Sequence, residues 1–158
     1  MRAYADSSFI LRLITGESGS EAVIAEYRHL GKPALFFLPV HNLEVRSAIL
    51  QRAFHQRHSL GPHHRRQADQ QRDAAFGRLA QMLSRRSLLD VLVDMDALFT
   101  RANALSLTHT ERIGSRAIDV LHVAAALTLA SEVFLTTDVR QSELARAEGL
   151  VVPVVEIT

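Results

Sequence analysis

Four acidic residues have types and positions that suit metal-ion chemistry. Asp6 and Asp138 come at the ends of two short apolar runs that are typical of strands, whereas Glu44 lies one turn into a predicted helix and Asp119 lies in the first turn of another. The carboxyl ends of neighbouring parallel strands share one edge of a sheet, so these acids are expected to converge there. Four carboxylates at one place repel one another unless a cation neutralises them. Mg²⁺ and Mn²⁺ prefer such oxygen ligands, and a pair of ions can activate water for phosphodiester cleavage.

Each of these acids also has an ordinary structural interpretation. Asp6 could cap a helix, Asp119 could interact favourably with a helix dipole, Glu44 could be exposed on a helix, and Asp138 could belong to a turn. Their joint placement at comparable ends of elements favours the metal site.

The central stretch for positioning the acids is residues 116–138. Apolar residues recur at helical spacing after Asp119 and cover most of the circumference of this helix. Such a helix packs against other elements on more than one side. A short apolar strand at 133–135 then leads to Asp138. In an α/β protein, such a helix lies against the sheet.

The remaining elements alternate in the same way. Strands are predicted near 2–5, 34–38, 88–93 and 150–155, with helices between them and a Gly61-Pro62 break. A helix is expected at 96–105, followed by a polar connection at 108–115. This order predicts an α/β fold with a parallel sheet between helices, formed by residues 1–158 as a single domain.

Composition excludes several classes of protein. The 158 residues suffice for one domain, and the lack of cysteine excludes disulfides and thiolate metal sites. No run is apolar for the roughly 18 residues that a membrane span needs, and the N-terminus has no signal-peptide core. We therefore expect a cytoplasmic protein that does not associate with membranes.

Positive charge is concentrated in residues 52–86. This segment has eight arginines and two aspartates, a balance of 8 − 2 = +6, against 10 − 15 = −5 for the rest of the chain. We interpret it as a helical, arginine-rich elaboration within the domain. A solvated helix face is the commoner explanation of such a segment, but arginine also suits phosphate recognition.

Four motifs carry a resemblance to a known family. The stretches YADSSFILRL, HNLEVRSAI, RAIDVLHVAAAL and FLTTDVRQSELARAEGL resemble the PIN-domain ribonucleases, most of all the VapC-type toxins of toxin–antitoxin pairs. The resemblance implies a three-layer α/β/α sandwich with a five-stranded parallel sheet of order 3-2-1-4-5. It also implies Mg²⁺- or Mn²⁺-dependent cleavage of RNA, often a structured RNA such as tRNA. Dimerisation and inhibition by a small cognate antitoxin are expected as well.

The resemblance assigns roles to individual residues. The catalytic and metal-binding acids of the family fall on Asp6, Glu44, Asp119 and Asp138. Thr137 matches a hydroxyl position that often supports the metal or its water, and Ser7 is a second supporting candidate. Where some members carry a further acid, this chain has Gln141, which implies a second metal site that is weaker or filled only with substrate.

Nearby basic residues have open interpretations. Arg116 and Arg140 are placed to meet substrate phosphates, or to pair with the acids. His122, inside the apolar helix, is more often a hydrogen-bonded core residue than a catalyst.

Three functions remain open. The first is a ribonuclease toxin, the second a housekeeping RNA-processing or structure-specific PIN nuclease, and the third a non-catalytic RNA- or protein-binding PIN module. Two other α/β classes fit poorly. A receiver domain needs a late lysine, whereas Lys32 is the only lysine, and a haloacid-dehalogenase-like phosphatase needs an acid where Ser8 stands.

Overall fold

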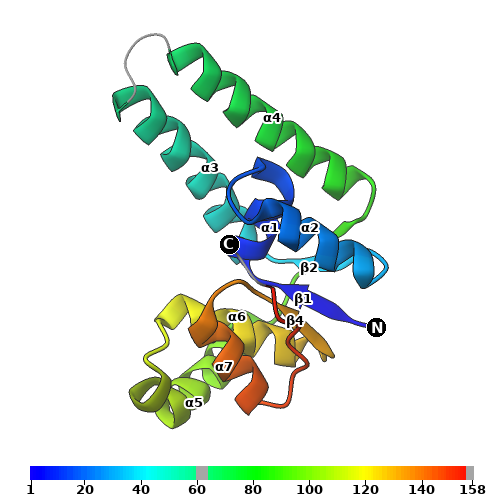
Figure 1. The fold of residues 1–158 in the computed structure, drawn as a ribbon. Coiled ribbons are helices and arrows are strands. Elements are labelled where there is room, and N and C mark those ends of the chain that lie inside the picture. The colour runs from blue at the N-terminus through cyan, green and yellow to red at the C-terminus, as the bar shows by residue number, and fades with distance from the viewer. Residues whose placement is uncertain (60–63, 156–158) are drawn as a thin grey trace.

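The sheet at the centre of the molecule has four short strands that all run parallel. The computed structural model describes residues 1–59 and 64–155. Its strands are β1 (Ala3–Ala5), β2 (Leu35–Phe37), β3 (Leu88–Asp90) and β4 (Val133–Leu135), in the order β3-β2-β1-β4. This confirms the predicted α/β fold and the order of its first four strands (Figure 1).

The predicted fifth strand is the one part of the sheet that differs. Residues 150–155 contribute only an isolated parallel bridge between Val151 and Val133. Pro153 has no N–H with which to continue a ladder, so pairing stops after one bridge. The expected five-stranded sheet is therefore corrected to a four-stranded sheet with one further bridged residue at its β4 edge.

Helices cover both faces of the sheet and complete three layers. One face packs against helices from the first half of the chain, and the other against helices from the second half (Figure 1). The first group is α1 (Ser7–Thr15), α2 (Ser20–His29), α3 (Pro39–Ser59) and α4 (Arg65–Ser84), and the second is α5 (Met95–Ile113), α6 (Ala117–Thr128) and α7 (Val139–Ala147).

Alternation along the central strands divides the core in two. In β1, Ala3 and Ala5 belong to the cluster beneath α1–α4, whereas Tyr4 points into the cluster beneath α5–α7. Phe134 in β4 joins Tyr4, and their rings stack with centroids 5.6 Å apart. Both strands are buried on both faces, as expected for a parallel sheet covered by helices. Their carboxyl ends are consequently fixed in position.

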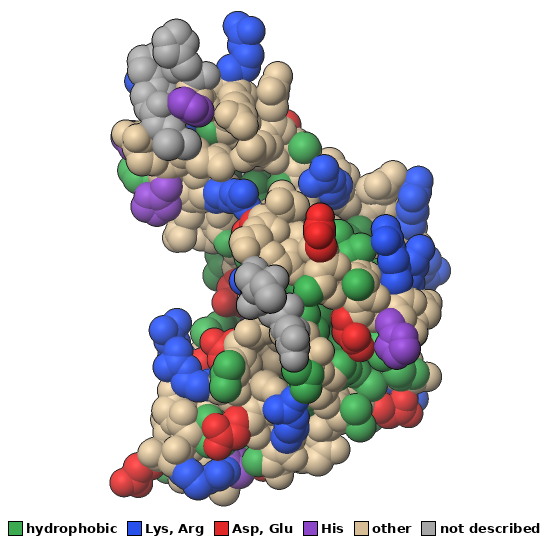
Figure 2. All heavy atoms as spheres, in the orientation of Figure 1, with side chains coloured by type: hydrophobic (Ala, Val, Ile, Leu, Met, Phe, Trp, Pro, Cys, Tyr) green, Lys and Arg blue, Asp and Glu red, His purple; other side chains and the backbone are tan. Residues whose placement is uncertain are grey.

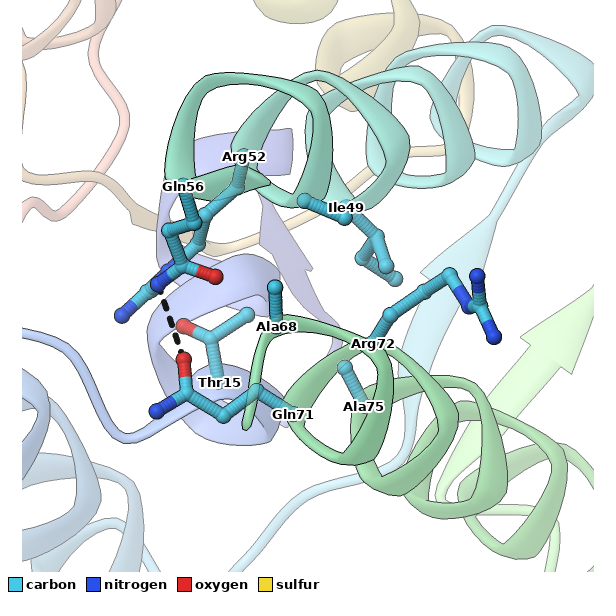
Figure 3. A pocket seen from close by; sticks show the side chains of 9 residues that line it. Thr15, Ile49, Arg52, Gln56, Ala68, Gln71, Arg72 and Ala75 are labelled. Atoms are coloured by element: carbon cyan, nitrogen blue, oxygen red, sulfur yellow. Dashed lines mark hydrogen bonds between the residues drawn. The ribbon is translucent and has the colours of Figure 1, made fainter. Parts of the chain in front are cut away.

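The arginine-rich elaboration is a long helical hairpin. Helices α3 and α4 pack side by side and project beyond the sheet (Figure 1). Small side chains at their contact, Ala53, Ala68 and Ala75, let the helices approach closely, and Gln56 donates to Gln71 at 2.8 Å (Figure 3). The predicted break at Gly61-Pro62 lies outside the described residues.

Helix α5 is longer than the sequence suggests. The predicted polar connection at 108–115 is wrong for most of its length, because the helix continues to Ile113 and stops at Gly114, whose φ is 74°. The hydroxyl of Thr108 donates to the carbonyl of Ala104 within the helix, and His109 is buried. Thr108, Glu111 and Arg112 are thus on the outer face of a helix, whereas His109 is on its inner face. No helix within the described ranges combines the length and the apolar character needed to cross a membrane.

Candidate active site

Asp6 sits where β1 ends and α1 begins, and its carboxylate is held on both oxygens. Oδ1 accepts the N-cap hydrogen bond from the Phe9 amide at 2.8 Å. The Ser8 hydroxyl donates at 2.9 Å to each oxygen, and the Thr136 hydroxyl donates to Oδ2 at 2.7 Å. The residue is only 1% exposed. The predicted capping role of Asp6 is therefore confirmed, and its second oxygen is bound by Thr136.

The charge of Asp6 is poorly compensated. Burial raises the pKa of Asp6, and the nearby His122 and the hydrogen bonds from Thr136, Phe9 and Ser8 offset this only in part. Within the described ranges, Asp6 forms no ion pair with any basic side chain. Keeping a carboxylate charged in such surroundings is costly, and a bound metal ion is one way in which proteins offset that cost.

Asp119 and Asp138 are joined through Gln141. Asp119, 5% exposed in the first turn of α6, accepts from the Arg116 amide at 2.9 Å and from Gln141 Nε2 at 3.1 Å. Asp138 caps α7 and accepts from the amides of Arg140 at 2.8 Å and Gln141 at 3.1 Å. The sequence pointed to Gln141 only as a missing acid, but the residue links two of the predicted acids.

Thr136 links Asp6 to the Asp138 turn. Its hydroxyl donates to Asp6 and accepts from the Asp138 amide at 2.9 Å. Thr137, the predicted supporting hydroxyl, instead bonds to Ser8 at 3.0 Å and accepts from Arg12 at 3.0 Å. Sequence reasoning missed Thr136, Ser8 and Arg12, although adjacent threonines before an acid were a signal that one of them would face it.

Glu44 has partners of its own. Its Oε2 accepts from the Ser7 hydroxyl at 2.7 Å and from His122 Nε2 at 2.6 Å. Burial raises the pKa of Glu44, but its interactions with His122 and the hydrogen bond from Ser7 outweigh burial, so the pKa is lowered. Ser7 therefore stands beside Glu44, and the adjacent Asp6 lies one residue away along the chain.

Three buried rings stand behind Glu44. His122, 2% exposed, bonds through Nδ1 to the Tyr4 hydroxyl at 2.8 Å, which agrees with the prediction of a hydrogen-bonded core histidine. Burial raises the pKa of Tyr4 well above its ordinary value, so the hydroxyl keeps its proton. Burial also lowers the pKa of His41 to about 3, and this neutral ring accepts from the Leu38 amide while Nε2 donates to the Ala5 carbonyl.

The two arginines expected to meet phosphates stand free of the acids. Arg116 is exposed and Arg140 partly buried. In the part of the chain that the structure describes, neither guanidinium group pairs with an acid. Both donate to carboxylates only through their backbone amides.

Hydrogen bonds through intervening residues join three of the four predicted acids, whereas Glu44 is bonded to Ser7 and His122. Thr136 joins Asp6 to Asp138, and Gln141 joins Asp138 to Asp119. Of these acids, Asp138 lines a pocket together with Thr136, Thr137 and Arg146. Figure 2 shows the side of the molecule hollowed between the α3–α4 hairpin and the α5–α7 layer.

Comparison with known protein families identifies the family of this chain. A model of the PIN domain matches residues 3–147, which includes every element from β1 to α7. The chain belongs to the PIN-domain family. Among curated proteins, none matches this chain. PIN domains are generally nuclease modules that act on RNA and typically depend on divalent metal ions, and a VapC-like subtype is consistent with the match.

The residues of this PIN domain suit a divalent cation in their chemistry. All four candidate ligands are carboxylates, and the amide oxygen Oε1 of Gln141 is buried without a hydrogen-bond partner beside Asp119. Among residues 1–59 and 64–155, no group of three His, Cys, Asp or Glu side chains stands ready to hold an ion as placed. The donor set therefore fits the metal in kind, and Asp6 and Asp119 supply its most buried members.

Proposed function

We propose that this PIN domain is a Mg²⁺- or Mn²⁺-dependent endoribonuclease that acts as the toxin of a toxin–antitoxin pair. The observation that carries the proposal is the buried Asp6 carboxylate at the end of the central strand. It receives neutral donors on both oxygens and has no cationic partner among the described residues. Such a group is ready to bind a cation, and substrate phosphates bring negative charge that the same cation attracts.

Asp6 and Asp119 are the proposed principal metal ligands, with Glu44 and Asp138 completing the set. When bound, the metal lowers the pKa of a water molecule and stabilises charge on the leaving oxygen. Thr136 fixes the orientation of Asp6, and Gln141 holds Asp119 and Asp138 in place. Arg116 and Arg140 bind the RNA phosphates, which is consistent with guanidinium groups that no acid neutralises.

The toxin role implies two protein partners. We expect a cognate antitoxin and a second copy of the chain in a homodimer. Apolar side chains are exposed along one face of α3, at Leu43, Leu50 and Phe54. Exposed apolar residues at this spacing, i, i+7 and i+11, lie on one helix face and are compatible with a protein partner.

Cleavage assays test the enzymatic part of this proposal. Purified protein is incubated with total RNA, including tRNA, in Mg²⁺ or Mn²⁺, beside EDTA and an Asp6→Ala variant. We expect cleavage with metal and its loss in both controls. Asp94→Ala is a matched control, because Asp94 also caps a helix but is exposed and far from β1 in sequence. Asp6→Ala protein that cleaves as well as wild type would contradict the proposed site.

Expression in growing bacteria tests the toxin part. We expect the wild-type chain to arrest growth and the Asp6→Ala chain to leave growth unaffected. An active nuclease that does not impair growth would instead support the housekeeping role.

A further inference from the structure

Arg12 lies close to the carboxyl edge of the sheet, where it contacts Thr137, and the proposed function gives it no role. It belongs to the last turn of α1, and its side chain is 23% exposed. Nη1 donates to the Thr137 hydroxyl at 3.0 Å and to the Ser8 carbonyl at 3.4 Å. Its Nε is buried without a hydrogen-bond partner, and Glu17 is 3.9 Å away. Glu17 also accepts a hydrogen bond from Arg52 at 2.9 Å, so its negative charge is shared between two arginines and neutralises Arg12 only in part.

The hydrogen bonds that lead from Arg12 have a determined direction. A guanidinium group has donors only, so Thr137 Oγ1 must accept from Arg12. The single proton of Ser8 is directed at Asp6, whose two oxygens both lie 2.9 Å from Ser8 Oγ. Ser8 must therefore accept from Thr137, 3.0 Å away, and Thr137 donates. The hydrogen bonds run one way, from Arg12 through Thr137 and Ser8 to Asp6.

We propose that Arg12 is a positioning residue that acts through Thr137 and Ser8 to hold Asp6 for cation binding. Aligned hydrogen bonds polarise one another, and a charged donor at the beginning strengthens those that follow. The chain fixes the Ser8 proton between the two oxygens of Asp6 and so fixes the carboxylate plane. This inference rests on the proposed function in one respect only, the binding of a divalent cation by Asp6.

Mn²⁺ affinity, measured by calorimetry or electron paramagnetic resonance, tests the proposal without RNA. We expect Arg12→Met to weaken Mn²⁺ binding by about tenfold, which is typical when a group that orients a metal ligand is removed. Thr137→Val keeps the side-chain shape but removes the hydroxyl, and it should weaken binding similarly. The double variant should bind Mn²⁺ no more weakly than the single variant with the lower affinity, because both changes break the same series of hydrogen bonds to Asp6. Arg12→Lys should restore part of the affinity.

Arg78→Met is the matched control. Arg78 donates to the Ile14 carbonyl at 2.8 Å, so its loss also removes an arginine bonded to α1, but it does not touch the chain to Asp6. Its Mn²⁺ affinity should equal that of wild type. Circular dichroism confirms that each variant is folded, and Thr137→Val tests the same chain if Arg12→Met does not fold.

Three results would overturn the proposal. They are unchanged affinity in both single variants, additive losses in the double variant, and a wild-type protein that does not bind Mn²⁺. Cleavage by the wild type is measured separately. A protein that binds Mn²⁺ but cuts no RNA would contradict the proposed function, while the affinities of the variants would still decide the role of Arg12.

Discussion

The Nε2 atom of His122 lies 2.6 Å from Oε2 of Glu44, although 78 residues separate them in the chain. The same ring bonds to the Tyr4 hydroxyl through its other nitrogen. A buried strand residue, a buried helix residue and a partly buried acid are therefore joined by hydrogen bonds that lead from the core to Glu44. Glu44 is held by the core itself, and not only by its position on α3.

Replacing His122 by alanine should raise the pKa of Glu44 and destabilise the fold. The change removes the partner that lowers this pKa. It also leaves the Tyr4 hydroxyl without its His122 hydrogen bond and creates a cavity in the core. We expect a loss of about 3 kcal/mol in the free energy of unfolding, measured by urea denaturation. Carboxyl NMR titration would follow Glu44. Tyr4→Phe is the milder comparison, with a loss of about 1 kcal/mol; a Glu44 pKa that does not move in His122→Ala would refute the pairing.

Asp6→Asn should make the metal-free protein more stable at neutral pH. The pKa of Asp6 is raised above its ordinary 3.8, so the folded state binds the proton more tightly than the unfolded state does. The stability from this proton is present below the unfolded pKa and is lost as pH rises through the folded pKa. Asparagine stays neutral and still caps α1.

Thermal denaturation in EDTA at several pH values measures this effect. The gain of the Asp6→Asn variant should grow from acid to neutral pH and reach about 1 kcal/mol. The exposed cap variant Asp94→Asn should show no such pH-dependent gain. A variant that is less stable than wild type at every pH would contradict the destabilising effect of the buried Asp6 charge.

Gln141→Asp should exchange stability for metal affinity. It removes the amide that donates to Asp119 and puts a third carboxylate beside Asp119 and Asp138. Repulsion should lower the melting temperature without metal, whereas added Mn²⁺ should raise it more than in wild type. Gln141→Leu, which removes the same amide without adding charge, separates the two effects. Equal Mn²⁺ responses in wild type and Gln141→Asp would rule out a cation at this position.

Removing the two arginines at the start of α4 should weaken RNA binding and its dependence on salt. Arg65 and Arg66 are exposed, and no described acid pairs with them. If both contact phosphates, Arg65→Ala with Arg66→Ala should reduce the slope of log K against log salt by about 1.4. Filter binding of single-stranded RNA in EDTA measures this. Arg2→Ala with Arg28→Ala removes the same charge outside the hairpin, and an equal reduction in that variant would exclude a specific role for α4.

The sequence contained most of the fold, because strands and helices here have clear apolar patterns. The strand before Asp138 and the helix after Asp119 were both predictable, since burial on several sides leaves nearly continuous apolar runs. The fifth strand was predicted wrongly, because residues 150–155 have an apolar pattern typical of a strand but Pro153 interrupts their pairing. The extension of α5 was missed because its exposed face is polar.

The hydrogen bonds of the site depend on the directions in which individual side chains point, and the sequence does not specify these. Thr136 and Thr137 are identical in type, and only the backbone at the end of β4 decides which of them contacts Asp6. Arg12 lies 125 residues from Thr137, so nothing local indicated their contact. Spacing predicted that the acids meet at one edge, whereas Thr136 and Gln141, the neutral residues that connect three of them, became visible only in three dimensions.

The length of α3 has a mechanical consequence. Glu44 lies in its second turn, and the helix continues to Ser59, fifteen residues later, a distance of about 22 Å at 1.5 Å per residue. A rotation of about 10° centred near Glu44 displaces that far end by about 4 Å and leaves Glu44 almost unmoved. A small change in the tilt of α3 would thus move its Ser59 end by several ångströms while the Glu44 carboxylate stays beside Ser7 and His122.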